Sequence, residues 1–217
     1  IAIDIPLMIQ RKDKIIDEIS YKMADLFAHH KIDHIQAKAR LLDARQVEIT
    51  VMDTQAHSIL DAKHIILATG SNPIELPCAP TDNEFIIDSI AALNHDAVPK
   101  KLAIIGAGVV GLELASIWNR LGSETILLEA QENFLSLLDQ QISGEAYRIY
   151  SQQGLDLRLG ARVISAKKGN KKVTVDYQDQ EGTHTLRVDK LIVACGRKPN
   201  TGELAAPEAD LLLDENG

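Results

Sequence analysis

The chain has 217 residues, which is enough for one large or two small domains. Its 45% apolar and 25% charged residues are an ordinary balance for a globular protein that buries a core. The formal net charge of −8 argues against nucleic acid or an anionic membrane as a partner. No apolar run approaches the ~18 residues that a membrane span needs.

The two cysteines, Cys78 and Cys195, are too few for a disulfide scaffold. They favour a reducing compartment, and we expect a cytoplasmic protein. No group of Cys, His and carboxylate residues has the spacing of metal ligands, so no metal site is expected. The chain begins with Ile rather than Met, and we therefore expect it to be an internal piece of a longer protein.

The spacing of apolar residues changes from helical to strand-like along the first part of the chain. Apolar residues recur at helical spacing over residues 6–31, which predicts one amphipathic helix. Apolar and polar residues then alternate over 47–51, which predicts a half-buried strand. We expect the neighbouring stretches 34–39 and 57–61 to pair with it as a small antiparallel meander.

The next segments favour a buried strand and a loop. The run "HIILATG" at 64–70 is short and nearly continuously apolar, which predicts a strand buried on both faces. Three prolines in "SNPIELPCAP" at 71–80 indicate a loop. A helix is predicted near 87–94, before the strand at 102–105.

The stretch from 102 to 128 predicts a strand, a turn, a helix and a second strand, with G-x-G-x-x-G at the turn. Gly106 permits the tight turn, Gly108 leaves room for a pyrophosphate, and Gly111 lets the helix pack closely on the strand. The unpaired N–H groups at the start of the helix favour an anion. This context predicts a dinucleotide site, although the motif alone would also fit a plain turn.

Glu129 ends the second strand, close to the ~20 residues after the motif at which a ribose-binding acid is expected. The alternative is an ordinary solvated acid at the end of a strand. A carboxylate accepts both ribose hydroxyls of NAD and repels the 2′-phosphate of NADP. Because no Arg follows within 130–134, NAD is favoured over NADP.

The rest of the chain adds β structure. "KKVTVDY" and "GTHTLRV" predict an antiparallel piece, and "LIVAC" at 191–195 predicts a buried strand whose cysteine is an inert thiol. The fold class is therefore α/β: a parallel sheet with helices on both faces, plus an antiparallel β-meander.

Several segments resemble one family in sequence and in order. "HIILATGSNPIELP", "LAIIGAGVVGLELASIWNRLG", "QQGLDLRLGARV" and "DKLIVACGRKPNT" are similar to the dihydrolipoamide dehydrogenases, among the two-dinucleotide flavoprotein disulfide reductases. The resemblance covers nearly the whole chain and implies a Rossmann-like FAD/NAD(P)-binding fold. It implies the rear part of an FAD domain at 1–85, an NAD domain at 86–203, and the start of the return to the FAD domain at 204–217.

The resemblance also implies site residues by position. Glu129 matches the adenosine-ribose acid, and Val163 and Gly196 match backbone contacts to NAD, although Gly196 also fits a plain turn. Glu113 matches the acid that faces the nicotinamide, or is an ordinary helix-surface acid. The pyrophosphate loop matches Gly106, Ala107, Gly108, Val109, Val110, Gly111, Leu112 and Glu113.

Flavin contacts are implied at Thr69, Gly70 and Ser71, which match the family's second flavin segment. Ala39 departs from the family, because it stands where a glycine usually contacts the flavin. The cofactors implied are thus NAD for this chain and FAD for the parent enzyme.

The family's catalytic groups have no match in this chain. It contains no C-x4-C pair, and none of its seven histidines is followed by proline, whereas the family uses His-Pro-Thr at its general base. The resemblance therefore implies no catalytic residue here and an inactive piece. Its parent would pass electrons from dihydrolipoamide on an acyltransferase core through FAD to NAD+, as a homodimer serving 2-oxo acid dehydrogenase complexes such as pyruvate dehydrogenase.

Two alternatives remain open. One is a sister flavoenzyme, such as an NADH oxidase or peroxidase with one redox cysteine, which the Gly-Leu-Glu motif does not exclude. The other is a non-catalytic NAD-binding module that senses redox state, which the lack of catalytic groups would suit.

Overall fold

A computed structural model describes residues 3–205, 209–215 and 217. The chain divides into two compact units. The first unit comprises Ile1–Gln10 and Pro73–Gly196, and the second comprises Arg11–Asn72 and Arg197–Gly217.

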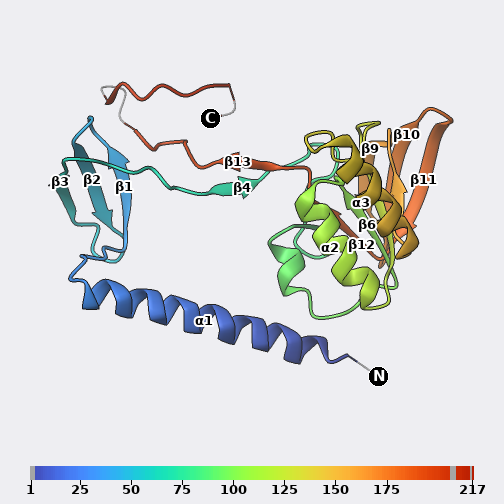
Figure 1. Ribbon diagram of the computed structural model, residues 1–217, viewed down its shortest axis with the longest axis horizontal. Helices are drawn as coiled ribbons and strands as arrows, with labels where there is room; N and C mark the ends of the chain where they lie inside the picture. The colour runs from blue at the N-terminus through green and yellow to red at the C-terminus, as the bar shows by residue number, and fades with distance from the viewer. Residues whose placement is uncertain (1–2, 206–208, 216) are drawn as a thin grey trace. The chain divides into compact units, whose positions relative to one another are not determined.

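The chain opens with one long helix, α1 (Ile5–His29), which confirms the helix predicted from the spacing of apolar residues (Figure 1). Asp4 caps it, because its side-chain oxygen accepts the N–H of Leu7 at 3.0 Å. Ile5 is its buried residue, and the apolar stripe that follows is exposed.

An antiparallel meander follows in the second unit, as predicted. Its strands are β1 (Ala37–Leu41), β2 (Gln46–Val51) and β3 (His57–Asp61), in the order β1-β2-β3. In the register Ile49 of β2 pairs with Ala39 on one side and Ser58 on the other.

The strand predicted at 64–70 is wrong. These residues form no strand, and Ile66 is 90% exposed. A strand buried on both faces needs strands beside it and layers above and below, and no strand among the described residues pairs with this segment. The pairing begins one residue later, where β4 (Ser71–Pro73) joins β13 (Arg197–Pro199) inside the stretch predicted as loop.

The first unit is built on a five-stranded parallel sheet in the order β5-β12-β6-β7-β8. Its strands are β5 (Ile86–Asp88), β6 (Lys101–Ile105), β7 (Glu124–Leu128), β8 (Asp156–Arg158) and β12 (Lys190–Val193). The strands predicted at 102–105, 125–128 and 191–195 are thereby confirmed.

The helix predicted near 87–94 is wrong. This stretch holds β5 and then a short 3-10 helix, η1 (Ala91–Asn94). The carboxylate of Asp88 accepts the N–H groups of Ile90 and Ala91 at 3.0 and 2.7 Å, which turns the chain directly after the strand. Parallel pairing of β5 with β12 then outweighs the local helical spacing.

Alternate residues of the sheet face two different layers. Leu102 and Ile104 of β6 pack into a cluster with helix α2 (Val109–Arg120) and residues of α3 (Gln140–Gln152). Ala103 and Ile105 pack into a second cluster with an antiparallel sheet. That sheet consists of β9 (Arg162–Lys168), β10 (Val173–Asp179) and β11 (Gly182–Val188), in the order β11-β10-β9.

The predicted α/β class with a Rossmann-like parallel sheet is confirmed, and one detail differs. Helices cover one face of this sheet, and the antiparallel sheet covers the other, where helices were also expected. The reason lies in Val173, Val175 and Val188, which are fully buried against that face because they alternate with polar residues.

A half-buried histidine lies against the one tryptophan. The rings of His95 and Trp118 have centroids 5.7 Å apart, and the indole is 3% exposed. Burial lowers the pKa of His95 below its usual value, the charge of Lys190 lowers it further, and Asp96 opposes both. The fold therefore favours the neutral form of this imidazole.

We expect acid to weaken the first unit through His95. The unfolded state takes up the proton near pH 6.5 and the folded state only at lower pH, so stability falls as pH drops from about 6.5 through the folded pKa. Denaturant unfolding followed by Trp118 fluorescence at pH 7 and pH 5.5 measures this. The loss should shrink in His95→Gln and persist in the control His64→Gln; equal losses in all three proteins would contradict it.

Replacement of Gly144 within α3 should stabilise the protein. A Cβ at this position would meet no atom within 4 Å, and the residue is exposed. Gly144→Ala should therefore raise the free energy of unfolding by about 1 kcal/mol, the helix-propensity difference. Urea unfolding checks this. A decrease in the free energy of unfolding would show that the added methyl group clashes with other atoms.

Candidate functional site

The glycine turn follows β6 directly. Gly106 has φ +99°, and a Cβ there would lie 2.6 Å from the carbonyl oxygen of Ala194 at the end of β12. The N–H of Gly106 donates to the carbonyl of Leu128 at 2.9 Å, which ties the turn to β7. Only glycine fits this position, because both the backbone angle and the space exclude a side chain.

Helix α2 starts at Gly108 with its first N–H groups open. Gly108 is the N-cap, it makes no side-chain cap, and a Cβ there would meet nothing within 4 Å. Val109 is 62% exposed in the first turn. Gly111 shows the opposite, because a Cβ there would lie 2.0 Å from the carbonyl oxygen of Gly106. The helix thus presses on the turn and presents free donors and its positive dipole end to solvent.

Glu129 reaches back from the end of β7 to the turn. Its Oε2 accepts the N–H of Ala107 at 2.8 Å, and its Oε1 accepts the N–H of Gln131 at 2.9 Å. Its own N–H donates to the carbonyl of Arg158, and its carbonyl accepts the N–H of Ala161. The predicted ribose acid and the predicted pyrophosphate loop are therefore in direct contact.

The end of β12 lies against the same turn. The Cα of Cys195 is 3.1 Å from the position of a Cβ on Gly106, and the thiol donates to the carbonyl of Ile74 at 3.7 Å. Burial raises the pKa of Cys195, a backbone hydrogen bond opposes it, and the nearby charge of Glu129 adds to the rise, so the thiol stays protonated. Gly196 follows with φ +122°.

The other predicted residues of the first unit have distinct surroundings. Val163 is half-buried in β9 and pairs with Tyr177. It lies two residues after Ala161, whose N–H bonds to the carbonyl of Glu129. Glu113 is exposed on α2. Gly106, Glu129 and Ala194 directly follow the carboxyl ends of β6, β7 and β12, where the chain leaves β6 on one side and returns on the other, the usual ligand position in such sheets.

The predicted flavin contacts lie in the second unit. Thr69 donates its hydroxyl to the carbonyl of Asn200 at 2.9 Å, and Ser71 accepts from Nε of Arg197 at 2.8 Å. Gly70 has φ +72° and accepts the N–H of Asn200 at 3.0 Å. These bonds join β4 and the two residues before it to β13 and the residue after it.

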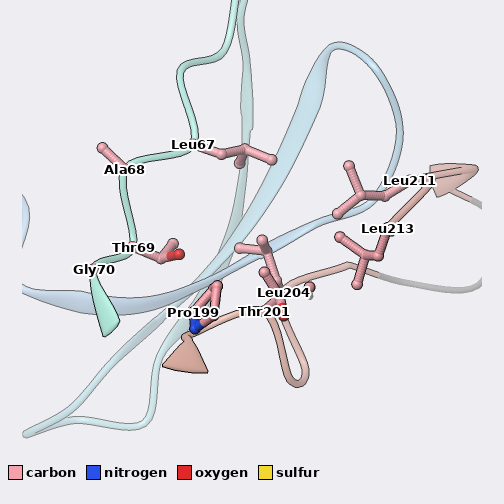
Figure 2. Close-up of a pocket in the computed structure, with 10 residues that line it drawn as sticks. Leu67, Ala68, Thr69, Gly70, Pro199, Thr201, Leu204, Leu211 and Leu213 are labelled. Carbon is pink, nitrogen blue, oxygen red and sulfur yellow. The ribbon is translucent and has the colours of Figure 1, made fainter. Parts of the chain in front are cut away.

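A cavity of about 340 Å³ borders Thr69 and Gly70. Figure 2 shows leucines from several segments facing it. Ala39 is exposed in β1 and is absent from the cavity lining. The lining residues are Leu67, Ala68, Thr69, Gly70, Pro199, Thr201, Leu204, Leu211, Leu213 and Gly217.

Sequence reasoning missed the surroundings of Arg158. This residue pairs with Leu128 in the register of β8 on β7, and its carbonyl accepts from Glu129. Its guanidinium is already engaged by Asp156 at 2.6 Å and by the hydroxyl of Tyr177. A basic residue thus lies next to the predicted ribose acid on the neighbouring strand, and no local sequence pattern predicts the register of β8 that brings it there.

Comparisons with known proteins cover the whole described chain. A family model described as Pyridine nucleotide-disulphide oxidoreductase matches residues 3–217. The curated dihydrolipoyl dehydrogenase of Cupriavidus necator is 38% identical over 218 residues, which are 100% of this chain and 46% of that protein. Dihydrolipoyl dehydrogenase 3 of Pseudomonas aeruginosa is 38% identical over 99% of this chain and 46% of that protein.

Solved structures give the same fold. The Cu(II) complex of the HOCl-induced flavoprotein disulfide reductase RclA from Escherichia coli has a TM-score of 0.82 at 27% identity, over 96% of this chain and 46% of that one. LpdA from Mycobacterium tuberculosis has a TM-score of 0.87 at 22% identity, over 100% of this chain and 48% of that one. The chain spans about half the length of the curated relatives it matches.

The two glycines at the start of α2 should respond differently to alanine. Gly111→Ala forces the turn and the helix apart and should lower the free energy of unfolding by about 1–3 kcal/mol. Gly108→Ala meets open space at φ −74° and should change it by less than about 1 kcal/mol. Denaturant unfolding of both variants measures this, and equal effects would contradict the packing described.

Proposed function

This chain belongs to the pyridine nucleotide-disulphide oxidoreductase family, and we propose that it is the NAD-binding core of a dihydrolipoyl dehydrogenase. The observation that carries the proposal is the contact between Glu129 and Ala107, which sets a carboxylate that would accept the ribose hydroxyls beside an open helix N-terminus. The identity to curated dihydrolipoyl dehydrogenases over the whole chain supports this choice within the family.

In the proposed NAD site the backbone does most of the binding. The N–H groups that follow Gly108 would hold the pyrophosphate, because the N-cap has no side chain to satisfy them. The carboxylate of Glu129 would accept the ribose hydroxyls with its remaining lone pairs. Glu113 would face the nicotinamide, Val163 and Gly196 would contact NAD through their backbones, and NAD would supply the hydride acceptor.

For FAD we propose contacts at Thr69, Gly70, Ser71 and Ala39. The cavity beside Thr69 and Gly70 supports the first two, since an apolar wall with a few polar groups suits a large aromatic cofactor. The flavin would carry the two-electron chemistry when bound, and the protein would hold and orient it.

We propose the domain division 1–85 and 204–217 for the FAD domain and 86–203 for the NAD domain. In support, the second unit contains both an early segment and the last segment, Arg197–Gly217. The chain thus leaves one unit and returns to it, as an inserted domain requires.

For the whole protein we propose FAD-mediated oxidation of dihydrolipoamide with NAD+ as the acceptor. Its partners would be the lipoyl group on the acyltransferase core of a 2-oxo acid dehydrogenase complex, such as pyruvate dehydrogenase, and a second subunit. Free Cys78 and Cys195 support a reducing compartment, for which we propose the cytoplasm. No described helix has both the length and the apolar character of a membrane span.

The similarity to RclA favours one second candidate, a flavoprotein disulfide reductase with another substrate. The complete reading frame discriminates between the two. A C-x4-C pair together with H-P-T-x-x-E supports the lipoamide enzyme, and a C-x4-C pair without that base supports the second candidate.

The chain should bind NAD(H) at least tenfold more tightly than NADP(H), a difference of about 1.4 kcal/mol. Glu129 would repel the 2′-phosphate, and the guanidinium of Arg158 is held by Asp156. Calorimetry with both nucleotides measures the ratio. Equal affinities would refute the specificity assigned to Glu129.

With FAD and NAD+ added, the purified chain should not oxidise dihydrolipoamide above background. The sequence has neither C-x4-C nor a His-Pro pair, and Cys195 is a protonated, half-buried thiol. The reaction is measured as NADH formation, from the absorption of the cofactor at roughly 340 nm. A full-length dihydrolipoyl dehydrogenase is the positive control. Turnover that survives further purification would show that other residues catalyse the reaction.

A further inference from the structure

Both oxygens of the Glu129 carboxylate are bonded within the protein before any nucleotide is present, to the N–H groups of Ala107 and Gln131. We infer that Glu129 is a positioning residue that fixes the glycine turn in its pyrophosphate-binding form, in addition to receiving the ribose. The inference rests on the proposed NAD site and adds a second role for one of its residues.

The bond to Ala107 matters because that residue is buried, with 2% of its surface exposed. A buried N–H without an acceptor is strongly unfavourable, so the peptide between Gly106 and Ala107 would rotate if the carboxylate were lost. Gly106 itself is fixed by Leu128, Ala194 and Gly111. The carbonyl end of this peptide packs on Gly111 and its N–H end bonds to the carboxylate, so Glu129 supplies the second of the two contacts that orient the peptide leading into α2.

Glu129 is itself held rigidly enough to do this. Its N–H donates to Arg158 at 2.9 Å and its carbonyl accepts from Ala161 at 2.8 Å, so the backbone is fixed on both sides. Each carboxylate oxygen accepts one hydrogen bond here and can accept a second, which leaves lone pairs for two hydroxyls. One side chain thus links the ribose to the turn that faces the pyrophosphate.

The negative charge makes this arrangement selective. A diphosphate with an attached ribose brings hydroxyl donors to Glu129, which offset the repulsion between its phosphates and the carboxylate. Inorganic pyrophosphate brings the repulsion alone. The site should therefore take ribonucleoside diphosphates and reject the bare anion.

Amide hydrogen exchange on the whole chain without nucleotide tests the positioning role. In Glu129→Ala the exchange rate of the Ala107 amide should rise at least tenfold, with a smaller rise in Glu129→Gln, whose amide oxygen still accepts a hydrogen bond. The neighbouring Gly106 amide bonds to Leu128 and should change less than twofold. The matched control is Glu124→Gln, the same charge change at the other end of β7 in the ion pair with Lys101.

Two results would overturn the inference. An Ala107 rate within twofold of the wild type in Glu129→Ala would show that the turn stands without the carboxylate. An equal rise at Gly106 and Ala107 would show a general loosening rather than a local role. Both readings are independent of nucleotide binding, so they stand even if the proposed NAD site fails.

Calorimetry with ADP and with inorganic pyrophosphate tests the selectivity. Glu129→Gln should bind inorganic pyrophosphate at least fivefold more tightly than the wild type and ADP more weakly. No gain for inorganic pyrophosphate would overturn the exclusion by charge. If neither the wild type nor Glu124→Gln binds ADP, the proposed nucleotide site is refuted, whereas the exchange of the Ala107 amide still decides the positioning role.

Discussion

The close approach of three backbones at Gly106 is the constraint on which the first unit depends. The turn after β6 touches the carbonyl of Ala194 at the end of β12, and Gly111 of α2 packs on the turn's own carbonyl. No side chain fits between them. The two glycines therefore fix how the helix lies on the sheet, and the open N-terminus of α2 follows from that packing.

Predictions from the sequence succeeded where the signal is local. The unit from β6 through α2 to β7 carries its own glycines, its own apolar period and its own strand ends, so residues 101–128 fold as their pattern indicates. The hairpin of β10 and β11 is equally local, because Val173 and Val175 alternate with polar residues. The contact of Glu129 with Ala107 follows from the same unit, since parallel strands β6 and β7 end at the same edge.

Predictions failed where a segment depends on distant partners. The apolar run at 64–70 can form a buried strand only if other strands pair with it, and its own sequence does not show whether they do. Here no described strand pairs with it. Residues 87–94 became strand and 3-10 helix because β12, far along the chain, pairs with β5. Arg158 was missed for a related reason: its place beside Glu129 depends on the register of β8 on β7, which no local pattern encodes.

The charge balance explains why the proposed site depends on short-range donors. A chain with net charge −8 repels an anionic dinucleotide at long range, but screening confines that repulsion to about 8 Å at physiological ionic strength. Within that distance the attraction of the fixed N–H groups of α2 exceeds the repulsion only if these groups already point toward the ligand. Any loss of order in the glycine turn would leave the repulsion and remove the attraction, so rigidity at Gly106 and Ala107 contributes to affinity as directly as any contact.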